Sequence, residues 1–270
     1  MDVLRQIDHW GAGFAAAGVV DRGTVAATHG DAAHAVRLAS VSKPITALAV
    51  LIAAEEGVVD LDEPSGPPGA TVRHLLAHAS GLPFEGTEPI APPGRRRIYS
   101  NEGFRVVGDL VASRAEMRFA DYVRAAICAP LELALDPAGH PGAGMHGSLA
   151  DLLTLARELR GPTLVAPETQ AEMTSVQFPG LDGVLPDWGR YSPLDWGLGV
   201  ELKGTKSPHW SGARTSQRTF GHFGGSGTFL WVDPDADVAC ACVTTRGFGD
   251  WAKDAWPRLS DDVLGALRGE

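Results

Sequence analysis

LASVSKPITALAVLIAAEEG, residues 38–57, is the stretch that decides the fold of this chain. The residues after its proline are apolar almost all round a helix, and the glycine at its end stops the helix there. Proline is tolerated in the first turn of a helix, and Ser40 or Ser42 could cap it. The pattern therefore predicts a helix over residues 40–56, buried in the centre of the molecule.

Both ends of the chain predict strands that join in one sheet. Residues 11–38 are rich in Gly and Ala and carry short apolar runs, which fits two or three strands. Residues 226–232 and 237–244 are strand-like, and the turn sequence DPDA joins them. Amphipathic patterns predict a short helix over residues 2–10 and a longer one over residues 250–268.

The middle of the chain is predicted to be helical and rich in loops. Helical periodicity marks residues 71–77, 102–128 and 147–160, whereas residues 176–219 are loop-rich. The predicted fold class is therefore α/β, of the α+β kind. An antiparallel sheet is built from both termini, flanked by helices, and a helical part is inserted between its halves.

The length of 270 residues suits one large domain or two interleaved ones, at roughly 100–200 residues per domain. We place a discontinuous sheet domain at residues 1–58 and 195–270, and a helical subdomain at residues 59–194. The net charge of −10 argues against nucleic acid as a partner, because phosphate binding needs a basic surface. No apolar stretch reaches the roughly 20 residues of a spanning helix, and the first ten residues do not resemble a secretory signal. We expect no membrane partner and a cytoplasmic location.

Scarce residues fall at the positions with chemical potential. The chain has one asparagine, four lysines and three tyrosines. Ser40 and Lys43 are three residues apart at the start of the buried helix, so both lie on one face within reach of each other. Burial lowers the pKa of a lysine, so Lys43 could act as a neutral base that activates Ser40. Taken alone, Lys43 could instead extend from the helix start into solvent.

Two further motifs add candidate groups. Tyr99 precedes the only asparagine, Asn101, by two residues; a Tyr hydroxyl can relay a proton, and an Asn amide can bind a carbonyl. Alternatively, Ser100 or Asn101 caps the helix that follows. The glycine-rich stretch GHFGGSG, residues 221–227, allows a substrate to lie against a strand edge. It could equally be a simple turn with His222 on the surface.

The order of these motifs resembles the penicillin-recognising serine hydrolases: class C β-lactamases, D-Ala-D-Ala carboxypeptidases and related family VIII esterases. The resemblance runs along almost the whole chain. It includes LASVSKP from residue 38, GVVDLDEP from residue 57 and HLLAHASGLP from residue 74. SLADL from residue 148 and LWVDP from residue 230 also match. This family implies a β-lactamase/transpeptidase-like fold with a shortened helical subdomain and no cofactor or metal.

The resemblance also implies roles for individual residues. Ser40 attacks a carbonyl to form an ester, and Lys43 with Tyr99 takes its proton and later protonates the leaving group. Asn101 and His222 orient the substrate. The turn at Gly224 and Gly225 completes the site, with the backbone N–H groups of Ser40 and Gly225 as the oxyanion hole.

Departures from the family pattern bear on the substrate. The third motif is His-Phe-Gly where typical β-lactamases have Lys-Thr-Gly, and a neutral imidazole is a poorer partner for a β-lactam carboxylate. We therefore predict a serine hydrolase that acts on small esters, amides or peptides. The alternatives are an acyltransferase on the same scaffold, a β-lactamase, and a non-catalytic protein that is acylated once. The oligomeric state is left open.

Some lesser candidates favour structural roles. Cys240 and Cys242 share one face of a strand and are expected to be a buried pair rather than a metal or redox site. His74 and His78 have helical i, i+4 spacing, but the family uses that stretch structurally. The arginines of residues 95–97 are expected in a solvated loop. Three tryptophans either line the pocket or only cover loops: Trp188, Trp196 and Trp210.

Overall fold

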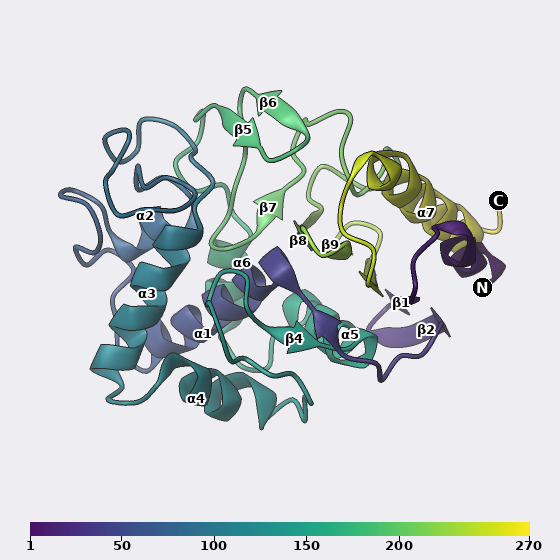
Figure 1. The fold of residues 1–270 in the computed structure, drawn as a ribbon, viewed down its shortest axis with the longest axis horizontal. Coiled ribbons are helices and arrows are strands. Elements are labelled where there is room, and N and C mark those ends of the chain that lie inside the picture. Colours follow the sequence, from purple (N-terminus) through teal and green to yellow (C-terminus); the bar gives the residue numbers. More distant parts are fainter.

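The structure is a computed structural model that describes residues 1–270 (Figure 1). Its helices are η1 Asp2–His9, η2 Ala39–Val41, α1 Ser42–Glu55, α2 Val72–Leu76, α3 Asn101–Arg114, α4 Phe119–Val123, η3 Arg124–Cys128, α5 Leu149–Arg160, α6 Pro167–Met173 and α7 Asp250–Arg268. Its strands are β1 Ala15–Asp21, β2 Thr24–His29, β3 Val36–Arg37, β4 His146–Gly147, β5 Gly183–Leu185, β6 Gly189–Tyr191, β7 Glu201–Leu202, β8 Phe220–Gly224, β9 Thr228–Asp233 and β10 Val238–Thr244.

One six-stranded antiparallel sheet joins the two ends of the chain. Its strand order is β2-β1-β10-β9-β8-β7, and the central pairing sets Ala15 opposite Thr244. The two termini therefore lie side by side, with η1 packed against α7 (Figure 1). The prediction of an antiparallel sheet built from both ends is confirmed.

Alternate residues of β10 enter two different hydrophobic cores, because successive side chains of a strand point to opposite faces. Ala239, Ala241 and Val243 lie in the core that contains α1 and α5. Cys240 and Cys242 lie in the core on the η1 and α7 face. The two thiols are buried and unpaired, as expected for a structural pair. Burial raises the pKa of both thiols well above the usual range.

Helix α1 is buried along nearly its whole length, as its apolar sequence predicts. It begins at Ser42, after the short helical turn η2 that carries Ser40. The expectation of a serine cap is wrong, because its N-cap residue is Val41 and no side chain caps it. The Ser42 hydroxyl instead accepts a hydrogen bond from the Met145 N–H at 3.2 Å, which ties α1 to the segment before β4.

The segment predicted as a helical subdomain contributes to both parts of the molecule. Helices α2, α3 and α4 gather beside α1, whereas α5 packs on β1 and β10 of the sheet (Figure 1). The loop-rich stretch before β8 holds the small β5–β6 hairpin and the short edge strand β7. No helix combines the length and apolar composition that a membrane crossing requires.

Candidate active site

The segment before α1 brings Ser40 and Lys43 together. Ala39 has a φ of +47°, a backbone conformation that residues other than Gly rarely adopt. This residue directly precedes Ser40 in the tight turn of η2. Lys43 lies one helical turn further on, and its Nζ is 3.2 Å from the Ser40 Oγ. The predicted proximity of the hydroxyl and the amine is confirmed.

The Lys43 amine is fully buried, so the alternative in which it extends into solvent is wrong. Its Nζ donates to the Asn101 Oδ1 at 2.6 Å and to the Gly142 carbonyl oxygen at 2.8 Å. The Tyr99 ring lies 4.6 Å from the same nitrogen. Burial holds the pKa of Lys43 well below its usual value, and no carboxylate pairs with it.

Counting hydrogens on a neutral Lys43 amine assigns the direction of its contact with Ser40. A neutral amine has two N–H donors and one lone pair. The oxygens of Asn101 and Gly142 are acceptors only, so they occupy both donors. A protonated Nζ donates to all three oxygens, that of Ser40 included, whereas a deprotonated Nζ leaves its lone pair for the Ser40 hydroxyl. This is the arrangement that a general base needs before a serine attacks.

The Tyr99 hydroxyl lies on the other side of the site, 3.3 Å from the His222 Nε2. Burial raises the pKa of Tyr99 well above its usual value of 10, and a hydrogen bond with Ser40 only partly opposes this. Tyr99 is therefore a neutral phenol near pH 7. It can pass a proton on, whereas Lys43 is the group able to accept one.

His222 is 2% exposed and lies in the middle of β8, so the alternative of a surface histidine is wrong. Its Nδ1 donates to the Phe223 carbonyl oxygen at 2.6 Å. This bond leaves Nε2 without a hydrogen, as an acceptor for the Tyr99 hydroxyl. Burial, together with the nearby Lys43, lowers the pKa of His222 to about 3. The imidazole is therefore neutral near pH 7.

The glycines after His222 allow β8 to approach Ser40 closely. A Cβ atom on Gly224 would lie only 2.4 Å from the Leu38 carbonyl oxygen, so only glycine fits there. The Thr228 hydroxyl donates to that same carbonyl at 2.8 Å. Gly225 is exposed, and its N–H donates no backbone hydrogen bond. This N–H is available to a substrate beside the turn that carries Ser40.

The segment Tyr99-Ser100-Asn101 both starts a helix and faces the site. Ser100 is the N-cap of α3, and its hydroxyl accepts from the Gly103 N–H at 3.0 Å. Asn101 is the first residue of α3 and binds Lys43 through Oδ1. The alternative that this segment caps a helix is thus confirmed for Ser100. Asn101, the next residue, contacts Lys43 as well.

Sequence reasoning missed the role of His78, which lies directly behind Tyr99. Its Nδ1 accepts the Ser100 N–H at 3.1 Å, and its ring centroid is 4.5 Å from that of Tyr99. His78 is 1% exposed and has a φ of +56°. Burial, with repulsion from Lys43, holds its pKa well below the usual value. The motif around His78 marked the stretch, but no spacing rule connects it to Ser100.

The lesser candidates fall into different places. Trp196 packs edge-on against the rings of Tyr99 and His222, so it lines the site. Trp210 packs against Phe223 in the η1 and α7 core. Trp188 is partly buried beside Phe248.

The expectation of a solvated arginine loop is wrong for Arg97, although Arg95 and Arg96 are exposed. Arg97 is 3% exposed and donates to the carbonyl oxygens of Ala77 at 2.7 Å and Leu194 at 3.0 Å. Its guanidinium binds backbone oxygens, and a sequence pattern does not show where those oxygens lie.

His74 has a structural role: Thr71 is the N-cap residue of α2 and forms a capping box with His74. No cluster of His, Cys, Asp and Glu is arranged to hold a metal ion.

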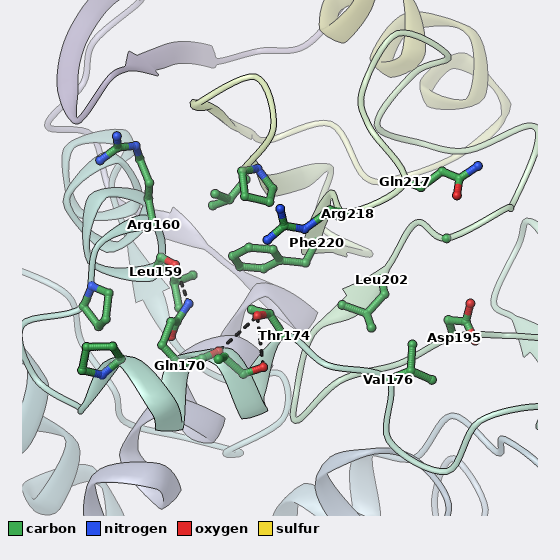
Figure 2. A pocket seen from close by; sticks show the side chains of 16 residues that line it. Leu159, Arg160, Gln170, Thr174, Val176, Asp195, Leu202, Gln217, Arg218 and Phe220 are labelled. Atoms are coloured by element: carbon green, nitrogen blue, oxygen red, sulfur yellow. Dashed lines mark hydrogen bonds between the residues drawn. The ribbon is translucent and has the colours of Figure 1, made fainter.

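A separate pocket of about 400 Å³ lies between α6 and the outer strands of the sheet (Figure 2). Its two arginines pair with aspartates rather than with each other or a common centre. Arg160 pairs with Asp237, and Arg218 pairs with Asp235 at 2.9 Å. None of the candidate site residues lines it, and it holds no nucleophile with a base. The cluster around Ser40 is therefore the candidate active site.

The fold defines a scaffold of serine hydrolases and acyltransferases, and comparisons with known proteins identify its family. The family model described as Beta-lactamase matches residues 4–264. The chain belongs to the β-lactamase family.

Individual relatives agree with this assignment. The structure of a β-lactamase from Mycobacterium bovis is 50% identical, covers 98% of both chains and has a TM-score of 0.96. EstCE1, described as a hydrolase with promiscuous acyltransferase activity, shares the fold at 19% identity, 97% coverage of both chains and a TM-score of 0.78. Penicillin-binding protein 4* of Bacillus subtilis is 29% identical over a match that covers 34% of this chain and 28% of that protein.

Proposed function

We propose that the protein is a serine hydrolase that acts on small esters, amides or peptides through a covalent acyl-enzyme. The observation that carries the proposal is the buried Lys43 amine, which has no carboxylate partner and lies 3.2 Å from the Ser40 hydroxyl. An amine kept neutral by burial is a competent base near neutral pH.

The steps follow from the geometry of these groups. Lys43 takes the Ser40 proton while Oγ bonds to the substrate carbonyl carbon, and the carbonyl oxygen becomes an oxyanion. The N–H groups of Ser40 and Gly225 bind that oxyanion; one such donor typically contributes about 10²–10³ in rate. The proton then reaches the leaving group, relayed through the Tyr99 hydroxyl, as the bond to the leaving group breaks. Water then attacks the carbonyl carbon of the acyl-enzyme and gives up a proton through the same groups. The bond to the Ser40 Oγ breaks, Oγ takes a proton, and the acid is released.

The neutral His222 supports esters, amides or peptides over β-lactams. Burial keeps its pKa at about 3, so it offers no positive charge to a β-lactam carboxylate near pH 7. A β-lactamase is the second candidate, favoured by the 50% identity to the β-lactamase from Mycobacterium bovis. Transfer of the acyl group to an alcohol or amine is the third, as in the activity described for EstCE1.

One set of assays tests these candidates together. A fluorophosphonate probe should add its mass to Ser40, and p-nitrophenyl acetate should be turned over. Both should vanish in Ser40→Ala and persist in Ser175→Ala, which removes an exposed serine. Nitrocefin turnover above that of the ester would favour the β-lactamase, and acceleration by an added alcohol would favour the transferase. A stable adduct with no second turnover would mean a non-catalytic binder, and no labelling or turnover of any substrate contradicts the proposal.

A further inference from the structure

A pocket of about 300 Å³ lies on the outer side of Tyr99. One wall comes from the loops that follow α2 and includes Phe84, Ile90 and Ile98. The other wall comes from the β5–β6 hairpin, at the top of the molecule in Figure 1, and includes Val184. Tyr99 itself forms part of the lining, so the pocket is separated from Ser40 by a single side chain.

The lining contains an unusual concentration of exposed apolar side chains. Phe84 is 49% exposed, Ile90 57% and Val184 55%. Single exposed apolar residues are normal on a protein surface and need no explanation. Here three of them, two from the loops after α2 and one from the β5–β6 hairpin, converge on one concavity, which is typical of a ligand-binding site.

Backbone contacts hold both walls in place. Arg97 forms a bridge with Gly183, and its N–H donates to the Asp182 carbonyl oxygen at 2.8 Å. The Ile90 N–H donates to the Gly81 carbonyl oxygen at 2.9 Å. The Phe84 ring stacks on the Tyr99 ring at 6.0 Å between centroids, with 18° between the planes. The pocket is therefore preformed, and its apolar side chains lie beside Tyr99. Four charged residues complete the lining: Arg96, Arg97, Asp182 and Arg190.

We propose that this pocket binds an apolar arm of the substrate, a short alkyl chain or a ring attached close to the scissile carbonyl. The inference rests on the proposed serine hydrolase function and specifies its substrate class. The arm belongs either to the acyl group or to the alcohol, and the same apolar contacts would hold it in both cases.

Two ester series test the proposal and distinguish the arms. The acyl series is p-nitrophenyl acetate, butyrate and hexanoate; the alcohol series is ethyl, butyl and hexyl acetate. In one of the two series, kcat/KM should rise about fourfold per added methylene until the pocket is filled. Val184→Asp and, from the opposite wall, Ile90→Asp should each lower the hexyl-to-short-chain ratio about tenfold. Val25→Asp, which changes a valine that is 48% exposed on β2 and outside the pocket, should leave that ratio unchanged.

The outcomes separate the two proposals. Labelling of Ser40 by a small fluorophosphonate shows that each variant is folded and has an intact nucleophile. A rise with chain length in either series, lost in the pocket variants, supports the pocket. Short-ester turnover without any dependence on chain length in either series overturns the pocket and leaves the hydrolase standing. The pocket proposal is also overturned, and the hydrolase proposal left standing, if neither Val184→Asp nor Ile90→Asp changes the hexyl-to-short-chain ratio of kcat/KM. Wild-type protein that neither labels nor turns over any ester overturns the proposed function first.

Discussion

Lys43 and Lys206 are both buried lysines, but their surroundings differ in one respect. Lys206 lies 3.4 Å from the carboxylate of Glu201, which is 1% exposed. His209 and Trp210 also bind that carboxylate, at 3.2 and 2.6 Å. Lys43 meets only neutral oxygens, from Ser40, Asn101 and Gly142, and aromatic rings.

The presence of a carboxylate decides what each lysine can do. Burial alone would raise the pKa of Glu201, but Lys206 and His209 outweigh it and lower that pKa to about 2. Burial lowers the pKa of Lys206, and Glu201 opposes that effect. Nothing opposes burial at Lys43. A buried lysine with a counter-ion is a structural charge, whereas one without a counter-ion becomes a base.

The largest expected effect is on activity at Lys43. Lys43→Met should lower kcat/KM for p-nitrophenyl acetate by about 10³, the scale of a lost general base. The free energy of unfolding should hold or rise, because Met fills the buried space and, unlike the amine, does not have to lose a proton and its hydration on folding. Steady-state assays and urea unfolding measure the two effects, with Lys253→Met, at a half-buried lysine of α7, as control. Activity within tenfold of wild type would exclude Lys43 as the base.

Lys206 should give the opposite pair of results. Lys206→Met leaves the Glu201 carboxylate without its ammonium partner, so the free energy of unfolding should fall by about 3 kcal/mol. Ester turnover at a temperature where the variant is folded should stay close to wild type. The double variant Glu201→Leu/Lys206→Met should recover much of the lost stability. Loss of activity in the folded Lys206→Met would mean that the two lysines are not separate in function.

His78, which packs against the Tyr99 ring, tests how far the surroundings of Lys43 depend on correct positioning of Tyr99 and Asn101. His78→Phe keeps a ring but removes the acceptor for the Ser100 N–H, so Tyr99 and Asn101 should shift relative to Lys43. We expect kcat to fall about 10- to 100-fold, the usual result of a small misplacement. His78→Asn, which tolerates a positive φ and restores an acceptor, should recover part of the loss. Equal activity in both variants would contradict a positioning role for His78.

The smallest effect is a pH dependence of stability. The pKa of Lys43 is lower in the folded chain than its usual 10.5, so above the folded pKa the unfolded state binds a proton that the folded state lacks. Stability therefore rises with pH in this window, by at most about 1.4 kcal/mol per pH unit. The difference in unfolding free energy between wild type and Lys43→Met should thus shift in favour of wild type from about pH 7 to about pH 9. An unchanged difference would show that Lys43 keeps its proton in the fold.

Local patterns in the sequence predicted most of the elements. The apolar run after Ser40 predicted a central helix, and the DPDA turn predicted the β9–β10 pair. Both features depend on residues close together in the chain, where backbone geometry and side-chain period act directly. The same reasoning placed Ser40 beside Lys43, because three residues along a helix return to the same face.

The amino-acid pattern alone thus predicted the central helix that contains Lys43, the strands of both termini and the order of the motifs. Only the tertiary structure decided the chemistry of those groups. Tyr99 meets His222 across 123 residues of chain, and the Gly142 oxygen reaches Lys43 from 99 residues away. Two predictions were wrong for the same reason: that a serine caps α1 and that Arg97 is solvated. Ser42 and Arg97 instead form hydrogen bonds with residues distant in the chain, Met145 and Ala77. The pKa of a group depends on burial and on which charges arrive from distant segments, and a local pattern contains neither.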